Sequence, residues 1–175
     1  RLLPGTDKIK VVIAGSAAEY GPASTGRLTE KTPANPATLY GSAKLSQTLA
    51  ALGYRHLGLA ITVARIFNIV GPATPERLSL GAFAKQIARI ERGLQAPHLE
   101  TGNLSGLRDF VDVRDVSRAL ALLAAASARP GVYNVCSGHA VSIGGCLERL
   151  LALSTVKIDV RPKHTRPQTT DLSRS

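Results

Sequence analysis

Short, almost wholly apolar segments alternate with longer segments of mixed polarity in the first half of the chain. Residues 9–15 (IKVVIAG) and 59–67 (LAITVARIF) are rich in β-branched side chains and predict buried parallel strands. Between them lie a Gly-, Pro-, Ser- and Thr-rich loop at 21–37 and a predicted helix at 39–52, which Gly53 ends. A strand, helix and strand of this kind indicate an α/β fold with a parallel sheet covered on both faces.

The second half continues with helices and short strands. The helix expected at 79–92 carries one apolar stripe, formed by Leu80, Phe83, Ile87 and Ile90. Two further helices are expected to begin at side-chain caps, with Asp115 capping a helix over 116–126 and Ser142 capping a helix that runs to about Leu153. The expected strands are 109–113, 132–135 and 156–160.

The excess of positively charged residues indicates which class of binding partner to expect. The 175 residues include 22 Lys and Arg against 12 Asp and Glu, a formal charge of +10, which favours anionic partners. The positive residues are scattered, and aromatic residues make up only 4% of the chain, too few for a base-stacking surface. We therefore expect a phosphate-bearing metabolite rather than a nucleic acid.

Other classes are disfavoured by what the sequence contains. Its longest apolar stretch, 119–126, is far shorter than the roughly 20 residues that cross a bilayer, so no membrane partner is expected. Cys136 and Cys146 form no CxxC pair and have no histidine at ligand spacing, which argues against a disulfide scaffold and a metal site. A cytoplasmic setting is the default. The chain begins at Arg1 and has no methionine, so we expect it to be part of a longer protein.

Tyr40 and Lys44 are the first candidates for chemistry. Residues four apart on a helix lie on one face. An ammonium near a phenol favours the phenolate and lowers its pKa from about 10, so such a tyrosine can exchange a proton with a substrate oxygen near neutral pH. Without further context, a chance solvent-facing pair is the better interpretation.

Ser16 is the second candidate, because it follows the first predicted strand directly. Ligands of open α/β sheets bind beyond the carboxyl ends of the strands, where a hydroxyl can hydrogen-bond the oxygen that Tyr40 protonates. The alternative is a serine that only caps a turn.

Five ordered segments together carry a resemblance to a known family. They are GSAAEYG (15–21), Tyr40-x-x-x-Lys44, RIFNIVGP (65–72), RDFVDVRDV (108–116) and YNVCSG (133–138). This series resembles the extended short-chain dehydrogenases/reductases, the NAD(P)-dependent nucleotide-sugar epimerases, dehydratases and reductases. Gly102-Asn103-Leu104 and Arg166-Pro167 are most similar to the branch of the GDP-mannose 4,6-dehydratases and GDP-4-keto-6-deoxymannose reductases.

The resemblance implies a role for each matching residue. Ser16 corresponds to the catalytic Ser/Thr, Tyr40 to the general acid/base, and Lys44 to the lysine that tunes the tyrosine and holds the nicotinamide ribose of NADP or NAD. Phe67 and Asn68 correspond to cofactor contacts, and Asn68 also to a sugar contact. Three basic residues correspond to contacts with a nucleotide-diphosphate sugar, GDP being favoured: Lys85, Arg108 and Arg166. By themselves, Lys85 would be a solvated helix residue and Arg108 could pair locally with Asp109.

Three positions depart from the family pattern. The dehydratases have a glutamate two residues after the catalytic Ser/Thr, whereas this chain has Ala18, so carbonyl reduction is favoured over dehydration. Glu19 is adjacent, but its side chain should point the other way if the segment is extended. Leu39 replaces the usual proline before the tyrosine, and Thr169 replaces an acidic residue near the ribose, which leaves the choice of nucleotide open.

The family's Gly-rich GxGxxG or GxxGxxG turn, which binds the dinucleotide pyrophosphate, does not occur in the sequence. We therefore expect the C-terminal half of a Rossmann-type parallel sheet with a small α+β substrate-binding region. Residues 1–72 would be the second half of the dinucleotide-binding domain and 73–175 the substrate-binding region, with 109–138 returning to the sheet.

The function that the resemblance implies is NAD(P)H-dependent reduction of a nucleotide-linked 4-keto-6-deoxy sugar, in a protein expected to form a homodimer. The alternatives are a nucleotide-sugar 4-epimerase or dehydratase, and a truncated relative that binds the nucleotide sugar without catalysis. The 175 residues by themselves are expected to be inactive.

Overall fold

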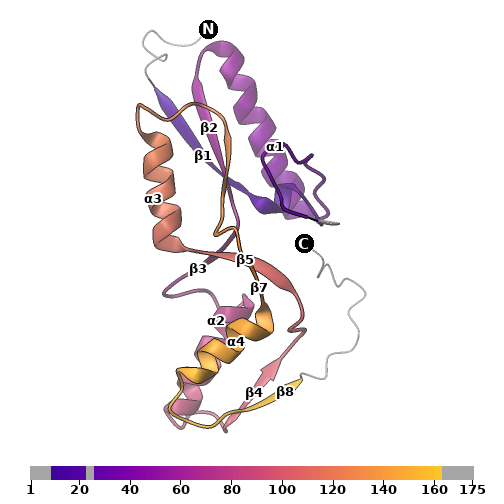
Figure 1. The fold of residues 1–175 in the computed structure, drawn as a ribbon, viewed down its shortest axis with the longest axis vertical. Coiled ribbons are helices and arrows are strands. Elements are labelled where there is room, and N and C mark those ends of the chain that lie inside the picture. Colours follow the sequence, from indigo (N-terminus) through magenta and orange to yellow (C-terminus); the bar gives the residue numbers. More distant parts are fainter. Residues whose placement is uncertain (1–8, 23–25, 163–175) are drawn as a thin grey trace. The chain divides into compact units, whose positions relative to one another are not determined.

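The structure, a computed structural model, describes residues 9–22 and 26–162, which form two compact units (Figure 1). Within the described residues, the first unit contains residues up to 69 together with 109–138. The second contains 70–108 and the residues from 139 onward.

A parallel three-stranded sheet forms the centre of the first unit. Its strands are β1 (Lys10–Ser16), β2 (Ala60–Ile66) and β6 (Val132–Val135), in the order β1-β2-β6. Ser16 is aligned with Ile66, which is in turn aligned with Val135, so the carboxyl ends of all three strands meet at one edge. The α/β fold and these three strands are confirmed, with boundaries within one residue of those expected.

Helices cover both faces of this sheet (Figure 1): α1 (Leu39–Gly53) and α3 (Val113–Ala124). Successive side chains of a strand point to opposite faces. Ala64 and Ile66 of β2 pack against α3 in one hydrophobic cluster, whereas the Arg65 side chain between them points to the α1 side. The expected parallel sheet with both faces covered is confirmed.

Helix α3 begins earlier than the sequence pattern suggested. Asp112, rather than Asp115, is the N-cap, and its carboxylate accepts the backbone N–H of Arg114 at 2.8 Å. The chain leaves the extended conformation at Asp112, so the first free N–H groups of the helix face that side chain. Asp115 lies within the first turn and pairs with Arg118.

The second unit is built around α2 (Ser79–Glu91) and α4 (Ile143–Ala152). Phe83 and Ile87 of α2 pack with Leu147 of α4 and with Leu99, which is fully buried. Ser142 caps α4 as expected, accepting the N–H of Gly145 at 2.9 Å.

Short strands complete the described part. β4 (His98–Thr101), which the sequence pattern missed, pairs in parallel with β8 (Asp159–Pro162). The strand expected at 156–160 is therefore displaced toward the C-terminus. The remaining strands are β3 (Asn68–Val70), β5 (Leu107–Asp112) and β7 (Ala140–Ser142), in the order β3-β5-β7, and the two 3-10 turns are η2 (Ala17–Glu19) and η3 (Tyr54–Leu57).

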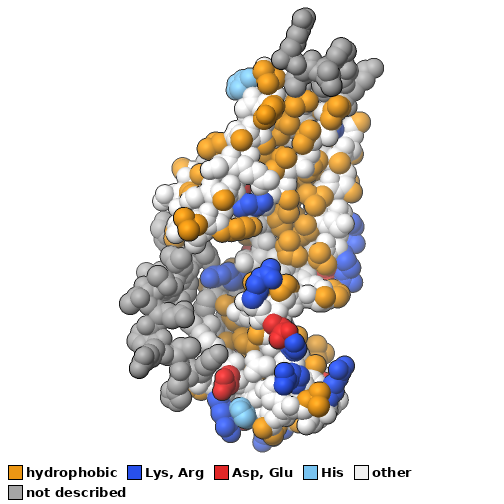
Figure 2. Space-filling model, turned by 180° about the vertical axis from the view of Figure 1, so that it is seen from behind, with side chains coloured by type: hydrophobic (Ala, Val, Ile, Leu, Met, Phe, Trp, Pro, Cys, Tyr) orange, Lys and Arg blue, Asp and Glu red, His pale blue; other side chains and the backbone are white. Residues whose placement is uncertain are grey.

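One face of the protein carries dispersed charge (Figure 2). On the face shown in Figure 2, Lys and Arg side chains lie apart from one another, and hydrophobic side chains gather over the first unit. In residues 9–22 and 26–162, no helix has both the length and the apolar composition needed to span a membrane.

Candidate functional site

The chain turns sharply where β1 ends, and Ser16 is the residue at that turn. Its backbone is extended, and its Oγ accepts the N–H of Ala18 at 3.2 Å, so Ser16 does cap η2. A serine hydroxyl that accepts through its oxygen keeps its own O–H as a donor. Ser16 can therefore cap the turn and still donate a hydrogen bond to a ligand.

Tyr40 lies in the first turn of α1, which Thr38 caps by accepting the N–H of Gly41 at 3.0 Å. The Tyr40 side chain is 60% exposed. Its hydroxyl forms no hydrogen bond with any residue that the structure describes. The phenol is thus open to a ligand.

Lys44, one turn further along α1, points to the end of β1. Its Nζ donates to the carbonyl oxygen of Ala14 at 2.6 Å and to Oε1 of Gln47 at 2.8 Å. An ammonium has three N–H donors, so one remains for a ligand hydroxyl. Ala14 is two residues before Ser16, so the Lys44 ammonium lies near the carboxyl end of β1.

The Glu19 side chain points into the protein. The segment is a 3-10 turn rather than an extended one, and the Glu19 side chain is fully buried. Its Oε2 accepts from Arg65 Nε at 2.9 Å, and its Oε1 accepts from Thr48 Oγ1 at 3.0 Å and from the Ser16 N–H at 2.9 Å.

Arg65 is a buried charged residue beside the candidate site that sequence reasoning did not single out. A charged side chain within an apolar strand was the available signal, because a buried charge needs a buried partner. Its guanidinium carbon lies 4.6 Å from the centre of the Tyr20 ring, and the Tyr20 hydroxyl donates to Asn134 Oδ1 at 2.7 Å. Burial opposes the charged form of Arg65, but its interactions with Tyr20 and Glu19 outweigh this and raise its pKa above the usual value.

Phe67 and Asn68 directly follow Ile66, which is the last residue of β2 and is aligned with Ser16. They therefore lie at the carboxyl edge of the sheet, where β1 also ends. The Phe67 N–H donates to the Val135 carbonyl at 3.0 Å. Asn68 is exposed, and its Nδ2 donates to the Asp109 carbonyl at 3.1 Å, which leaves its amide oxygen available as an acceptor.

The alternative interpretation of Arg108, a local ion pair with Asp109, does not match the structure. Nη1 of Arg108 donates to the carbonyl of Leu107 at 2.8 Å. The Asp109 carboxylate instead accepts the backbone N–H groups of Ser137 at 2.8 Å and Gly138 at 2.7 Å. Backbone donors outcompete the neighbouring guanidinium because they are already held in place by the turn after β6.

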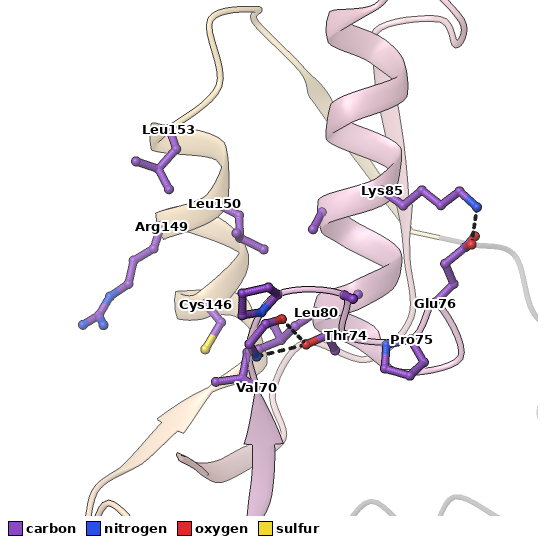
Figure 3. Close-up of a pocket in the computed structure, with 15 residues that line it drawn as sticks. Val70, Thr74, Pro75, Glu76, Leu80, Lys85, Cys146, Arg149, Leu150 and Leu153 are labelled. Carbon is purple, nitrogen blue, oxygen red and sulfur yellow. Dashed lines mark hydrogen bonds and ion pairs between the residues drawn. The ribbon is translucent and has the colours of Figure 1, made fainter. Parts of the chain in front are cut away.

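Two cavities are lined by described residues of the second unit. One, of about 670 Å³, lies between the loop 70–76, α2 and α4, and Lys85 at its rim pairs with Glu76 (Figure 3). The other, of about 420 Å³, is more polar and includes Gln86, Glu100 and Asn103 in its lining. Arg108 also belongs to this unit, whereas Arg166 and Thr169 lie outside the described residues.

Several known proteins are similar to this chain. GDP-6-deoxy-D-mannose reductase of Pseudomonas aeruginosa is 39% identical over 103 residues, which are 59% of this chain and 34% of that protein. dTDP-6-deoxy-L-talose 4-dehydrogenase (NAD(P)(+)) of Kitasatospora kifunensis is 32% identical over 166 residues, 91% of this chain and 52% of that protein. The chain thus spans between a third and about half of the length of these relatives.

Solved structures agree with the sequence relatives. The structure of RMD from Pseudomonas aeruginosa complexed with NADPH superimposes with a TM-score of 0.85 at 31% identity, over 91% of this chain and 55% of that one. Thermus thermophilus UDP-glucose 4-epimerase in complex with NAD gives a TM-score of 0.71 at 25% identity, over 87% of this chain and 51% of that one. The first unit is therefore part of a Rossmann-type fold.

The family described as GDP-mannose 4,6 dehydratase matches residues 1–173, nearly the whole chain. Together with the relatives and the shared fold, this match shows that the chain belongs to the GDP-mannose 4,6 dehydratase family of the extended short-chain dehydrogenases/reductases.

Proposed function

We propose that the protein containing this chain is an NAD(P)H-dependent reductase of a nucleotide-linked 4-keto-6-deoxy sugar, with GDP as the favoured nucleotide. The observation that carries the proposal is the chemistry available where β1 ends. The Ser16 hydroxyl lies in the turn after β1, and the exposed Tyr40 hydroxyl is carried by the first turn of α1, which packs on that turn, while the one carboxylate of the turn 16–22, Glu19, is fully buried.

Those hydroxyls suit the reduction of a carbonyl group. Tyr40 would give its proton to the sugar carbonyl oxygen as that oxygen gains negative charge, and Ser16 would hold the same oxygen by donating a hydrogen bond. The phenolate left on Tyr40 would be reprotonated from solvent. The carbonyl would thereby become an alcohol, with one proton and one hydride added.

The same residues are less suited to catalysing dehydration of the sugar than to reducing its carbonyl group. That reaction needs a base to remove a proton from the sugar ring, and Ala18 has no group that can accept one. Glu19 is held inside by Arg65 and Thr48, so its carboxylate is not accessible to a sugar. The proposal therefore favours a reductase over a dehydratase.

Lys44, Phe67 and Asn68 would hold the cofactor, NADPH or NADH. The N–H of Lys44 that Ala14 and Gln47 leave unused suits a ribose hydroxyl, and the available amide oxygen of Asn68 suits a carboxamide N–H donor. When bound, the reduced nicotinamide supplies the hydride. The relatives compared above include proteins solved with NADPH and with NAD, which supports this class of cofactor.

The second unit would bind the nucleotide diphosphate. Lys85 and Arg108 provide cations that can form charge-assisted bonds to phosphate oxygens, and Arg166 is proposed to join them. Lys85 would exchange its surface pair with Glu76, which costs little because such pairs contribute about 0–1 kcal/mol. We further propose a cytoplasmic homodimer; the free thiols of Cys136 and Cys146 are compatible with a reducing compartment.

The direct test incubates the full-length natural protein that contains this chain with GDP-4-keto-6-deoxymannose and NADPH. We expect the NADPH absorbance to fall and GDP-6-deoxymannose to form. Nucleotide-sugar binding without turnover would overturn the proposal in favour of a non-catalytic relative. The 175-residue chain, assayed in parallel, is expected to give no turnover.

Variants connect the activity to the proposed residues. Tyr40→Phe should lower kcat by about 10²–10⁴-fold because it removes the general acid. Tyr54→Phe is the matched control, since Tyr54 is 52% exposed and lies beyond the end of the same helix. Equal activity of the two variants would contradict the role of Tyr40.

A nucleotide-sugar 4-epimerase is the second candidate. It is favoured by the similarity to UDP-arabinose 4-epimerase 1 of Arabidopsis thaliana, 27% identical over 87% of this chain and 41% of that protein. An epimerase would return its cofactor to the starting redox state. The NADPH absorbance would then stay constant while the sugar changed configuration.

A further inference from the structure

We propose that Glu19 is a positioning residue, whose buried carboxylate fixes Ser16 relative to the helix that carries Tyr40 and Lys44. This inference rests on the proposed function of that site. The carboxylate contacts three segments: the turn after β1 through Ser16, α1 through Thr48, and β2 through Arg65.

One oxygen of Glu19 joins the two halves of the proposed catalytic group. Oε1 accepts from the Ser16 N–H at 2.9 Å and from Thr48 Oγ1 at 3.0 Å. Thr48 is one helical turn after Lys44 and two turns after Tyr40, so all three share one side of α1. A displacement of Oε1 would shift Ser16 relative to the helix that carries the other two side chains.

The other oxygen of Glu19 is fixed to the sheet. Arg65 Nε donates to Oε2 at 2.9 Å, and this guanidinium is itself stacked on Tyr20, whose hydroxyl is bound to Asn134 of β6. Both charges are buried, with 9% of the Arg65 side chain and none of the Glu19 side chain exposed. A buried charge that loses its partner is strongly destabilised, so the carboxylate has little freedom to move.

The backbone before Ser16 is shaped around this carboxylate. A Cβ at Gly15 would lie 2.8 Å from Glu19 Oε1 and 2.9 Å from Val63 Cγ1. Real Cβ contacts are longer, so only a glycine lets the carboxylate lie this close to β1. Position 15 thus leaves no room for a side chain between Glu19 and Val63.

A simpler role for Glu19 is that of a capping box, in which a glutamate bonds back to the N-cap backbone of a helix. That role concerns only the contact with Ser16 and would affect stability alone. The bonds to Thr48 and Arg65 exceed it, because they join the three-residue turn to two distant elements. The two roles differ in what they predict for turnover.

The variant Glu19→Asp separates the effect of side-chain length from the effect of negative charge. The shorter side chain keeps the negative charge for Arg65 but cannot span all three partners. In the full-length natural protein, we expect kcat to fall by about tenfold with KM for the sugar within about threefold, as for loss of a transition-state interaction. Thr48→Val is the second variant, for the case that Glu19→Asp does not fold, because it removes only one hydrogen-bond donor to Glu19. It should also lower kcat while leaving KM for the sugar nearly unchanged, with a smaller loss of kcat than Glu19→Asp.

Two comparisons distinguish positioning from stability. Val116→Ala opens a cavity in the cluster on the α3 face, and it should lower the melting temperature while leaving kcat intact. In a Ser16→Ala background, the effect of Glu19→Asp on kcat should shrink to within about twofold, because residues that act as a unit are not additive. A full tenfold loss in that background, or an equal loss in Val116→Ala, would overturn the proposal.

Amide hydrogen exchange tests the contact without any activity. The Ser16 N–H should be protected in the wild-type protein and exchange about tenfold faster in Glu19→Asp, since opening of its bond to Oε1 governs exchange. The N–H of Val63, bound to the Gly131 carbonyl at 2.8 Å, is the control and should not change. Rapid exchange at Ser16 in the wild type would overturn the role of Glu19, whereas protection in a protein without turnover would overturn the proposed function instead.

Discussion

Gly41 lies so close to Ala18 that a Cβ at position 41 would be only 2.5 Å from the Ala18 carbonyl oxygen. The first turn of α1 therefore packs directly on the backbone of η2, the turn that follows Ser16. Tyr40 is the residue before Gly41. The absence of one side chain thus sets how near the proposed general acid comes to the proposed hydrogen-bond donor.

The first prediction concerns Gly41→Ala. In an exposed helix, this change would stabilise the protein by about 0.5–1 kcal/mol, because glycine is the poorer helix former. Here we expect the reverse: a lower melting temperature and a kcat about tenfold lower, because the methyl group pushes α1 away from the turn and misplaces Tyr40.

Gly53→Ala is the control for this prediction. Gly53 ends the same helix, and a Cβ there would meet nothing within 4 Å. Thermal unfolding and steady-state kinetics of the full-length natural protein measure both variants. If Gly41→Ala proves as harmless as Gly53→Ala, the close packing of α1 on η2 does not control the site.

The first unit shows which features could be predicted from sequence. β1 and β2 are both β-branched runs, and β2 is buried along almost its whole length whereas β1 is mostly half-buried, so their pattern depends little on context, and the boundaries were within one residue. The helix at 39–53 begins at its Thr38 cap and is rich in Leu and Ala, which favour a helix despite Gly41. In each case local propensity and burial favour the same structure.

The failures have a common cause in tertiary contacts. β4 has only four residues, of which Leu99 and Thr101 alone are buried, so its pattern is too short to identify without its partner β8. The inward direction of Glu19 depends on Arg65, 46 residues further along, and no local pattern shows that pairing. The roles of Ser16, Tyr40 and Lys44 remain predictions, because they depend on ligands and not on the fold.

Asp109→Asn is the second prediction. The Asp109 carboxylate accepts the N–H groups of Ser137 and Gly138 with different oxygens. An asparagine would place an NH2 group against one of these donors, so we expect a loss of about 1–3 kcal/mol in the free energy of unfolding. Asp115→Asn is the control, since its exposed pair with Arg118 should contribute less than about 1 kcal/mol. Denaturant unfolding that gives equal losses would refute the claim that Asp109 holds this turn.

Leu99→Ala is the third prediction, and it concerns the core of the second unit. Leu99 is fully buried against Phe83, Ile87 and Leu147. Its truncation should destabilise this unit by about 2–5 kcal/mol through lost burial and the cavity that remains. Leu107→Ala, at a side chain that is 60% exposed, should have little effect. The measurement is denaturant unfolding, together with hydrogen exchange of the amides in α2 and α4. Equal losses of unfolding free energy in the two variants would contradict the prediction.

The fourth prediction concerns pH and the loop before α1. Glu30 accepts the N–H of Asn134 at 2.8 Å, and this bond, followed by one to its own backbone, lowers the pKa of Glu30 below the ordinary 4.5. A carboxylate with a lowered pKa in the folded state binds protons more weakly there than in the unfolded chain. Its stabilising effect is therefore complete above pH 4.5 and is lost as the pH falls through the folded-state pKa.

Glu30→Gln tests this directly, because the amide oxygen can still accept the Asn134 N–H but the side chain no longer titrates. We expect the wild type to melt at a higher temperature than the variant near neutral pH, and the difference to shrink as the pH falls below 4.5. Melting temperatures of both proteins from about pH 7 to about pH 3 provide the measurement. A difference that stays constant over this range would mean that the negative charge of Glu30 does not anchor the loop to β6.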